Sequence, residues 1–160
     1  MEEFGFSKGI FTLYQIDKNT NEKTILVHDD NVIVNNSWLI VSGLLNGETD
    51  KIISSLSLGD GGIIDSKLQT PSVNDTVLFN ELFRKESIEE TIIETILTPY
   101  SITFKFSIDE LEANGTSAQI YSEAGLLSVD GTMFSRKTFA EVVKTPEKKF
   151  LIDWKLVYSI

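Results

Sequence analysis

The clearest hydrophobic pattern in the chain lies at its C-terminal end. Six apolar side chains there are each separated by one residue: Phe150, Ile152, Trp154, Leu156, Tyr158 and Ile160. A period of two is typical of a β-strand with one buried face. Fully extended, the stretch from Phe150 onward would reach about 36 Å at ~3.3 Å per residue. We therefore predict that part of this strand projects, bends or pairs with another chain.

The same alternation recurs in the middle of the chain, where Ile102, Phe104, Phe106 and Ile108 are separated by polar residues. This pattern predicts a half-buried antiparallel strand. Asn114–Gly115 and Asp130–Gly131 follow it, and both pairs favour tight turns between strands. The second half of the chain is therefore predicted to be rich in β-strands.

A hairpin is predicted near the N-terminus. One strand carries Ile10, Thr12, Tyr14 and Ile16 on a single face, residues 18–21 form the turn, and residues 24–27 return. Phe11 and Leu13 make the other face apolar too. We therefore expect both faces to be covered, by another sheet or by a partner subunit.

The spacing of apolar residues changes to a helical period over residues 37–45. Asn35 or Asn36 is a suitable N-cap, and Asn46–Gly47 ends the helix. Trp38, Val41 and Leu45 are predicted to form its buried face.

Residues 52–58 predict a strand that ends at Gly59, and a polar loop should follow it up to Pro71. Residues 74–84 predict one or two helical turns, with Asp75 as cap and Leu78 and Leu82 on a common face. Together these elements predict a single domain, residues 1–160. Its expected fold is mainly β, an antiparallel β-sandwich with a short helical insertion near residues 37–45.

Composition excludes several kinds of function. The 160 residues include no cysteine, so disulfides, thiolate metal sites and cysteine nucleophiles are excluded. The net charge of −10 argues against sequence-specific nucleic acid binding, which needs clustered Lys and Arg. No apolar stretch approaches the length of a membrane span, and the N-terminus lacks the pattern of a secretory signal. We expect synthesis in the cytoplasm and no membrane partner.

Candidate catalytic chemistry is sparse. The one histidine, His28, has no nucleophile signature to join it. The turn Gly59-Asp60-Gly61-Gly62 lacks the Lys and Ser or Thr of a phosphate-binding loop and the spacing of a calcium loop. We expect it to be a turn that ends a strand and uses glycine for positive φ. The chain is therefore predicted to be no enzyme and to hold no metal or cofactor.

Three charged residues lie among apolar neighbours: Arg84, Glu123 and Arg136. A charge at a core position is costly unless it is paired. We hypothesise that Glu123 meets Arg136 across the hairpin that turns at Asp130–Gly131. The alternative, in which both charges face solvent, stays open.

Several of these features also occur in an order that resembles small tail-associated structural proteins of tailed bacteriophages, such as fibre N-terminal, collar and baseplate adaptor domains. The resemblance is carried by Asn31–Asn35 with the short helix after it, Leu58–Gly62, Asp75-Thr76 with Leu78, Glu81-Leu82 and Arg84, Glu123–Leu127, Gly131–Arg136 and the final strand around Trp154. It implies a structural motif of nine residues: Gly59, Asp60, Gly61, Arg84, Glu123, Gly125, Gly131, Arg136 and Trp154.

The resemblance implies a non-catalytic virion component that is made in the bacterial host cytoplasm. Such a protein would form homo-oligomers, as rings or trimers, and would join other virion proteins. The alternative from a different class is a monomeric carbohydrate-binding β-sandwich. Tyr14, Tyr100 and Tyr121 are the aromatic residues that would form its sugar platform.

Overall fold

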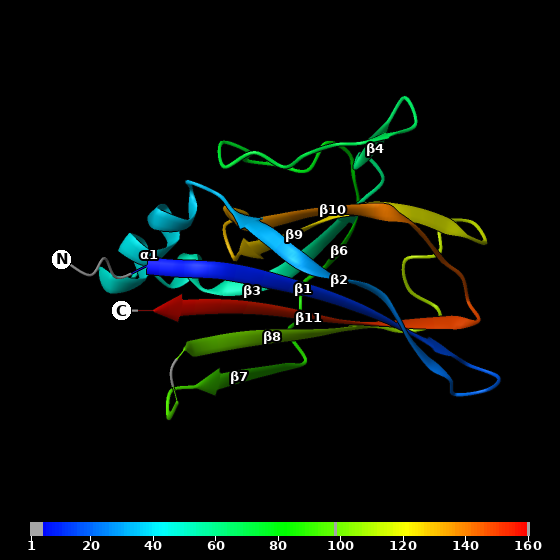
Figure 1. Ribbon diagram of the computed structural model, residues 1–160, viewed down its shortest axis with the longest axis horizontal. Coiled ribbons are helices and arrows are strands. Elements are labelled where there is room, and N and C mark those ends of the chain that lie inside the picture. The colour runs from blue at the N-terminus through cyan, green and yellow to red at the C-terminus, as the bar shows by residue number, and fades with distance from the viewer. Residues whose placement is uncertain (1–4, 98, 160) are drawn as a thin grey trace.

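The structure is a computed structural model that describes residues 5–97 and 99–159. It is mainly β, with one short α-helix (Figure 1). In chain order the elements are β1 (Gly5–Asp17), β2 (Lys23–Ile33), α1 (Ser37–Leu45), the 3-10 helix η1 (Thr49–Lys51), β3 (Ile53–Gly59), β4 (Ile63–Ile64), β5 (Lys67–Leu68), β6 (Glu81–Lys85), β7 (Glu90–Glu94), β8 (Tyr100–Ile108), β9 (Gln119–Ser128), β10 (Met133–Lys144) and β11 (Lys148–Ser159).

Nine of the strands form one curled antiparallel sheet in the order β6-β3-β9-β10-β2-β1-β11-β8-β7. Strand β2 connects its two halves, because residues 23–31 pair with β1 whereas Val32 and Ile33 pair with β10. We call β1, β11, β8 and β7 the β11 layer, and β10, β9, β3 and β6 the β9 layer (Figure 1). This arrangement confirms the predicted β-sandwich class.

The core lies between the two layers. From the β11 layer it takes fully buried side chains such as Phe11, Leu13 and Trp154, and from the β9 layer Leu56 and Leu126. The ring of Phe11 meets that of Trp154 edge to face at 5.0 Å, a preferred geometry for aromatic pairs. The strand patterns around residues 102–108 and 150–156 are confirmed by the burial of Phe104, Phe106, Ile108, Phe150, Ile152, Trp154 and Leu156.

The final strand is not free to project. Strand β11 pairs with β1 from Gly5↔Ser159 to Asp17↔Lys148, and with β8 on its other side. Projection and pairing with another chain are therefore wrong for residues 148–159, whereas bending agrees with the curl of the sheet; Ile160 lies outside the described residues. In β1 the fully buried core residues are Phe11 and Leu13, so the face of Ile10 and Tyr14 points outward and is only partly covered.

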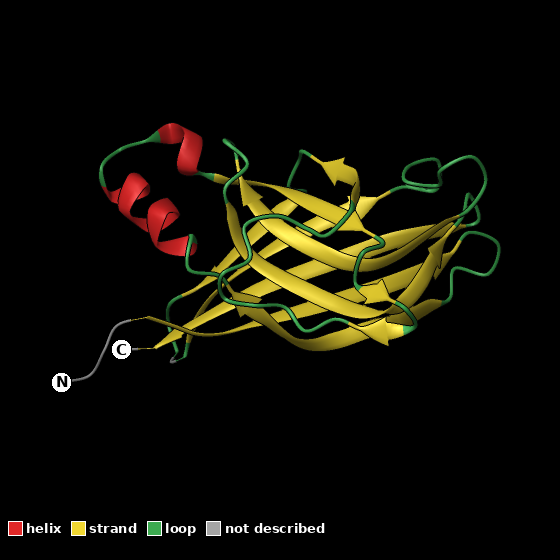
Figure 2. Ribbon diagram, turned by 90° about the horizontal axis from the view of Figure 1, so that it is seen from above, coloured by secondary structure: helices red, strands yellow, loops and turns green. Residues whose placement is uncertain are grey.

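Helix α1 has the predicted bounds, but the predicted buried face is wrong. Its buried residues are Ser37, Ile40 and Gly43, while Trp38 and Leu45 are 52% and 86% exposed. The helix lies at one end of the sandwich, where it contacts mainly η1 and β10 (Figure 2). Only a narrow stripe around Ile40 reaches the core, and the apolar spacing around Trp38 therefore does not mark a core face.

The predicted helical turns at residues 74–84 are absent. A loop covers residues 74–80 and is followed by β6, which pairs with β3 through Leu58↔Phe83. Leu78 is buried, but Leu82 is 42% exposed, so the two do not share a buried face. Strand pairing with β3 overrides the local four-residue spacing here.

Lys144, at the end of β10, is buried and holds the connection between β8 and β9. Its ammonium donates to the carbonyl of Glu110 at 3.1 Å, to Asn114 Oδ1 at 2.9 Å and to the carbonyl of Thr145 at 3.1 Å. The turn predicted at Asn114–Gly115 is present, but the positive φ angles belong to Ala113 and Gly115. Burial lowers the pKa of Lys144 from its usual 10.5 to about 8.

This lowered pKa predicts a pH dependence of stability. Between pH 8 and 10.5 the unfolded chain holds the Lys144 proton and the folded chain releases it, so this residue adds stability as pH rises. The difference in unfolding free energy between the wild type and Lys144→Met should therefore shift in favour of the wild type across this window. Urea unfolding at pH 7.5, 9 and 10.5 measures it, and a constant difference would contradict the prediction.

Candidate functional site

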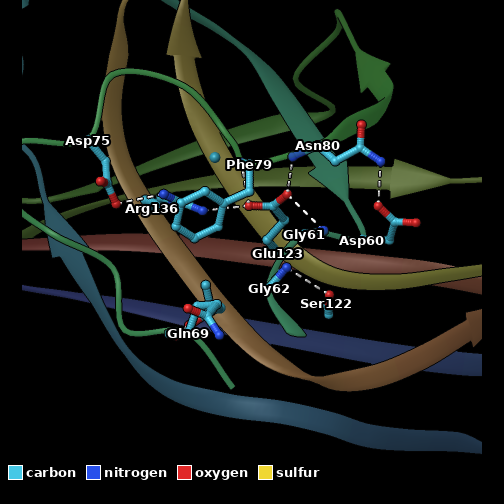
Figure 3. A network of polar contacts seen from close by, with 12 residues as sticks. Asp60, Gly61, Gly62, Gln69, Asp75, Phe79, Asn80, Ser122, Glu123 and Arg136 are labelled. Atoms are coloured by element: carbon cyan, nitrogen blue, oxygen red, sulfur yellow. Dashed lines mark hydrogen bonds and ion pairs between the residues drawn. The ribbon is translucent and has the colours of Figure 1, made fainter. Parts of the chain in front are cut away.

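The site that unites most of the candidate residues lies on the outer face of the β9 layer (Figure 3). Residues of β9 alternate between two faces: Ala124 and Leu126 enter the core, whereas Glu123, Gly125 and Leu127 point away from it. Arg136 of β10 pairs with Gly125 and so lies on the same outer face. Both Glu123 and Arg136 are nevertheless fully buried.

They are buried by a loop that we call the strap, residues 69–80. Its start is held by Gln69, whose N–H donates to the Gly62 carbonyl at 2.8 Å and whose carbonyl accepts from the Thr138 hydroxyl at 2.6 Å. In the middle, the Val73 carbonyl accepts from the N–H of Asn35 at 2.7 Å. Leu78 then packs with Val34, Leu127 and Met133 in a small second apolar cluster.

The Glu123 carboxylate accepts four hydrogen bonds. Oε1 accepts from the backbone N–H groups of Gly61 at 3.0 Å and Asn80 at 2.8 Å. Oε2 accepts from the N–H of Phe79 at 3.0 Å and from the Arg136 guanidinium at 2.6 Å. A carboxylate has about four lone-pair sites, so Glu123 is fully satisfied.

Arg136 joins two carboxylates. One terminal nitrogen binds Glu123, and the other binds Asp75 Oδ2 of the strap at 2.6 Å. The guanidinium carbon also lies 4.0 Å from the centre of the Phe79 ring, within range of a cation–π contact. Arg136 Nε is buried without a hydrogen-bond partner among the described residues.

The predicted ion pair between Glu123 and Arg136 is therefore confirmed, although its register differs from a simple hairpin. Arg136 lies opposite Gly125 and Glu123 lies opposite Thr138, because the turn already pairs Met133 with Leu127 and a bulge between Met133 and Ser135 shifts the pairing by one further position. The two charges are diagonal neighbours on one face, a separation that long side chains span.

The glycine-rich turn after β3 is shaped by close approach. Gly59, Gly61 and Gly62 do not have positive φ, so the expected reason for these glycines is wrong. A Cβ on Gly59 would lie 2.2 Å from the Asn80 carbonyl, and one on Gly61 would lie 2.4 Å from Phe79 Cβ. Gly59 and Gly61 have no room for a side chain because the strap and Glu123 occupy the space, and Gly62 has none because its Cβ would lie 1.9 Å from the Ser122 carbonyl oxygen.

The remaining motif residues fall into two groups. Asp60 accepts a hydrogen bond from the Asn80 amide at 2.6 Å, and Gly125 lies beneath Leu78, so both belong to the site. Arg84 instead pairs with Glu81 of its own strand, through bonds of 2.6 and 2.7 Å. Gly131 forms the β9–β10 turn at φ 83°, and Trp154 lies in the core.

Sequence reasoning missed Asp75, Phe79 and Asn80 as members of this site. Asp75 was interpreted as a helix cap, and it instead binds Arg136. The sequence does hold one signal for a further partner of Arg136. A buried arginine has five N–H donors, and these need more acceptors than one carboxylate provides. That signal does not tell which loop supplies the second acceptor, because the strap is distant from Arg136 in sequence.

The other residues considered for chemistry lie elsewhere. His28 is exposed and its Nδ1 lies 2.9 Å from the Thr12 hydroxyl. Tyr121 is buried, and its hydroxyl donates to the Ala113 carbonyl at 2.9 Å, so the three tyrosines do not form a joint platform. Burial raises the pKa of Tyr121 to about 12.

Among residues 5–97 and 99–159, no cluster of three or more His, Asp or Glu side chains is arranged to hold a metal ion. None of the helices in this part of the chain is long and apolar enough to cross a membrane. Comparisons with protein families, curated proteins and solved structures gave no match. The arrangement itself serves to fasten the strap and the glycine turn to the β9 layer.

Breaking the ion pair should strongly destabilise the fold. Removal of one partner leaves a buried charge unpaired, so Glu123→Ala and Arg136→Ala should each cost about 3–5 kcal/mol of unfolding free energy. The double variant should cost less than the sum of the two, since neither Glu123 nor Arg136 is then buried without the other, and the loss of the Asp75 partner is common to both variants that lack Arg136. Chemical unfolding of the four proteins in this cycle measures the coupling, and additive losses would contradict a direct interaction.

Close packing at the glycine turn predicts a second stability effect. Gly61→Ala should lose about 1–3 kcal/mol of unfolding free energy, because the new Cβ would displace Phe79 and Glu123. Gly5→Ala is the matched control, since a Cβ there meets nothing within 4 Å. Similar melting temperatures for the two variants would show that the strap can move aside at little cost.

Proposed function

We propose that the protein is a non-catalytic structural component of a phage virion, a tail, collar or baseplate adaptor. In this role it assembles with copies of itself and joins neighbouring virion proteins. The resemblance in sequence order supports the virion assignment. Support for assembly comes from the surface of the molecule.

The observation that carries the proposal is the exposure of large apolar side chains at one end of the sandwich. Helix α1 and the β7–β8 connection both lie at this end (Figure 1). α1 exposes Leu45 to 86% and Trp38 to 52%, and the connection exposes Ile96 to 94% and Leu97 to 79%. Neighbouring exposed apolar side chains are typical of protein-binding surfaces, and α1 alone exposes four of them: Trp38, Leu39, Leu44 and Leu45.

The polar site supports the same role. The Glu123 carboxylate is saturated by four donors and is fully buried, so it is not available as a general base or a ligand. Five of the residues that carry the resemblance, Gly59, Asp60, Gly61, Glu123 and Arg136, contribute to this packed network. Their contribution is to hold one rigid shape, which is what a building block requires.

Assembly through the helix end can be measured by size exclusion coupled to light scattering over a range of concentrations. The wild type should form a discrete multimer as concentration rises. The double variant Trp38→Ser/Leu45→Ser should require at least about tenfold higher concentration, because burying each of these side chains contributes ~1.5–3 kcal/mol.

Leu111→Ser is the matched control. Leu111 is 85% exposed, nearly the same as Leu45, but it lies in the β8–β9 connection at the opposite end of the sandwich (Figure 1). This variant should assemble as the wild type does. A wild type that stays monomeric at every concentration, or an equal effect of both variants, would contradict assembly through the helix end.

A further inference from the structure

The two edge strands of the curled sheet differ in whether their charged side chains form ion pairs within the chain. Strands β6 and β7 end the strand order, so within the described residues each has a hydrogen-bonded neighbour on one side only. On β6, Arg84 is paired with Glu81, and Lys85 is paired with Glu112 at 2.7 Å. The charges of that edge are therefore neutralised within the chain.

The β7 edge is exposed and acidic. All five of its residues are exposed, and Ile93 is 62% exposed. Glu90, Ile92 and Glu94 alternate along the strand and so share its outward face. Glu90 makes no ion pair with any described residue, whereas Glu94 accepts from Ser101 at 2.7 Å and Lys155 at 3.2 Å. An unpaired edge of this kind is a template for another strand.

The charges across the outward face indicate what that strand should carry. Asp153 of β11, Lys105 of β8 and Glu90 of β7 lie in one row across three paired strands. Asp153 and Lys105 form an ion pair at 3.2 Å, so the row reads negative, positive, negative. Opposite charges on directly facing strand positions are favourable. The next position in this row therefore favours a cation.

A second copy of this chain does not fit the edge through β7 itself. Antiparallel pairing of two β7 strands around Ile92 would place Glu90 of each copy opposite Glu94 of the other. Directly opposed like charges destabilise a strand pair. Pairing of β7 with a second β7 in this register is therefore disfavoured.

We propose that the free edge of β7 binds an extended segment of a partner protein by strand addition. The segment carries lysine or arginine at positions i and i+4, opposite Glu94 and Glu90, and a β-branched residue between them, opposite Ile92. At the Glu94 end of the strand, an open hollow lined by Ile93, Glu94, Thr95, Ile96, Leu97, Pro99 and Lys155 adjoins the site and can receive an apolar side chain of the segment. This inference rests on the proposed assembly role and names the chemistry of one partner.

The test uses the full chain and a fluorescein-labelled peptide, Thr-Lys-Val-Val-Thr-Lys-Thr, with binding followed by fluorescence anisotropy. A control peptide of the same composition, Lys-Lys-Thr-Val-Thr-Val-Thr, keeps the net charge and loses the i, i+4 spacing. The first peptide should bind about two- to fivefold more tightly than the control, since it places both cations opposite glutamates whereas the control can place only one. If the two peptides bound equally, binding would depend on net charge alone and not on the spacing of the lysines, and the inference would be overturned.

The charge-reversed variant Glu90→Lys/Glu94→Lys makes the test specific to this edge. This variant should no longer bind the lysine peptide and should instead bind the glutamate peptide Thr-Glu-Val-Val-Thr-Glu-Thr. Amide hydrogen exchange supplies a second readout: the lysine peptide should slow exchange in residues 90–94 and leave the other edge, residues 81–85, unchanged. No binding, or protection of residues 81–85 instead, would overturn the proposal.

Failure of this inference can be told apart from failure of the proposed function. If the protein forms multimers but does not bind the lysine peptide, the assembly role is supported and the β7 site is overturned. If the protein stays monomeric at every concentration but binds the peptide at residues 90–94, self-assembly is contradicted and the β7 site is supported.

Discussion

Most of the β9 layer is arranged around one constraint, the burial of the Glu123 carboxylate. Removing an ion from water costs several kcal/mol, so a fold that buries one must surround it with donors. Here those donors come from the glycine turn, the strap and Arg136. Arg136 is buried in turn and requires Asp75. One buried charge thereby determines the position of a loop that contributes no strand to the sheet.

This constraint separates the surface of the molecule into regions with different properties. Over the outer face of the β9 layer, the strap closes the polar groups away from solvent and holds their geometry. The helix end, in contrast, leaves large apolar side chains exposed, and the β7 edge leaves acidic ones exposed. The proposed assembly role rests on these open apolar and acidic surfaces.

The sequence predicted the strands well where one face is buried, as in Phe104, Phe106 and Phe150 to Leu156, because burial imposes the period of two. It also predicted the Glu123–Arg136 pair, since a buried charge needs an opposite charge nearby. It failed where local spacing had no partner to enforce it: Leu78 and Leu82 are four apart in a loop and a strand, and Trp38 and Leu45 follow a helical period on an exposed face. The contact between Asp75 and Arg136 could not be predicted from the sequence. It depends on how the strap folds back over the β9 layer, and no local pattern encodes that path.

The pairing of β1 with β11 also sets how the molecule responds to force. Gly5 lies opposite Ser159 at one end of this strand pair, and the register continues to Asp17 and Lys148 at the other. Tension that pulls Gly5 and Ser159 apart acts across the strands and would break the hydrogen bonds of the ladder one after another. Tension applied along opposite ends of the two strands would load all of those bonds together. The sandwich is thus mechanically anisotropic: it yields readily when pulled from the Gly5–Ser159 end and resists shear along its strands.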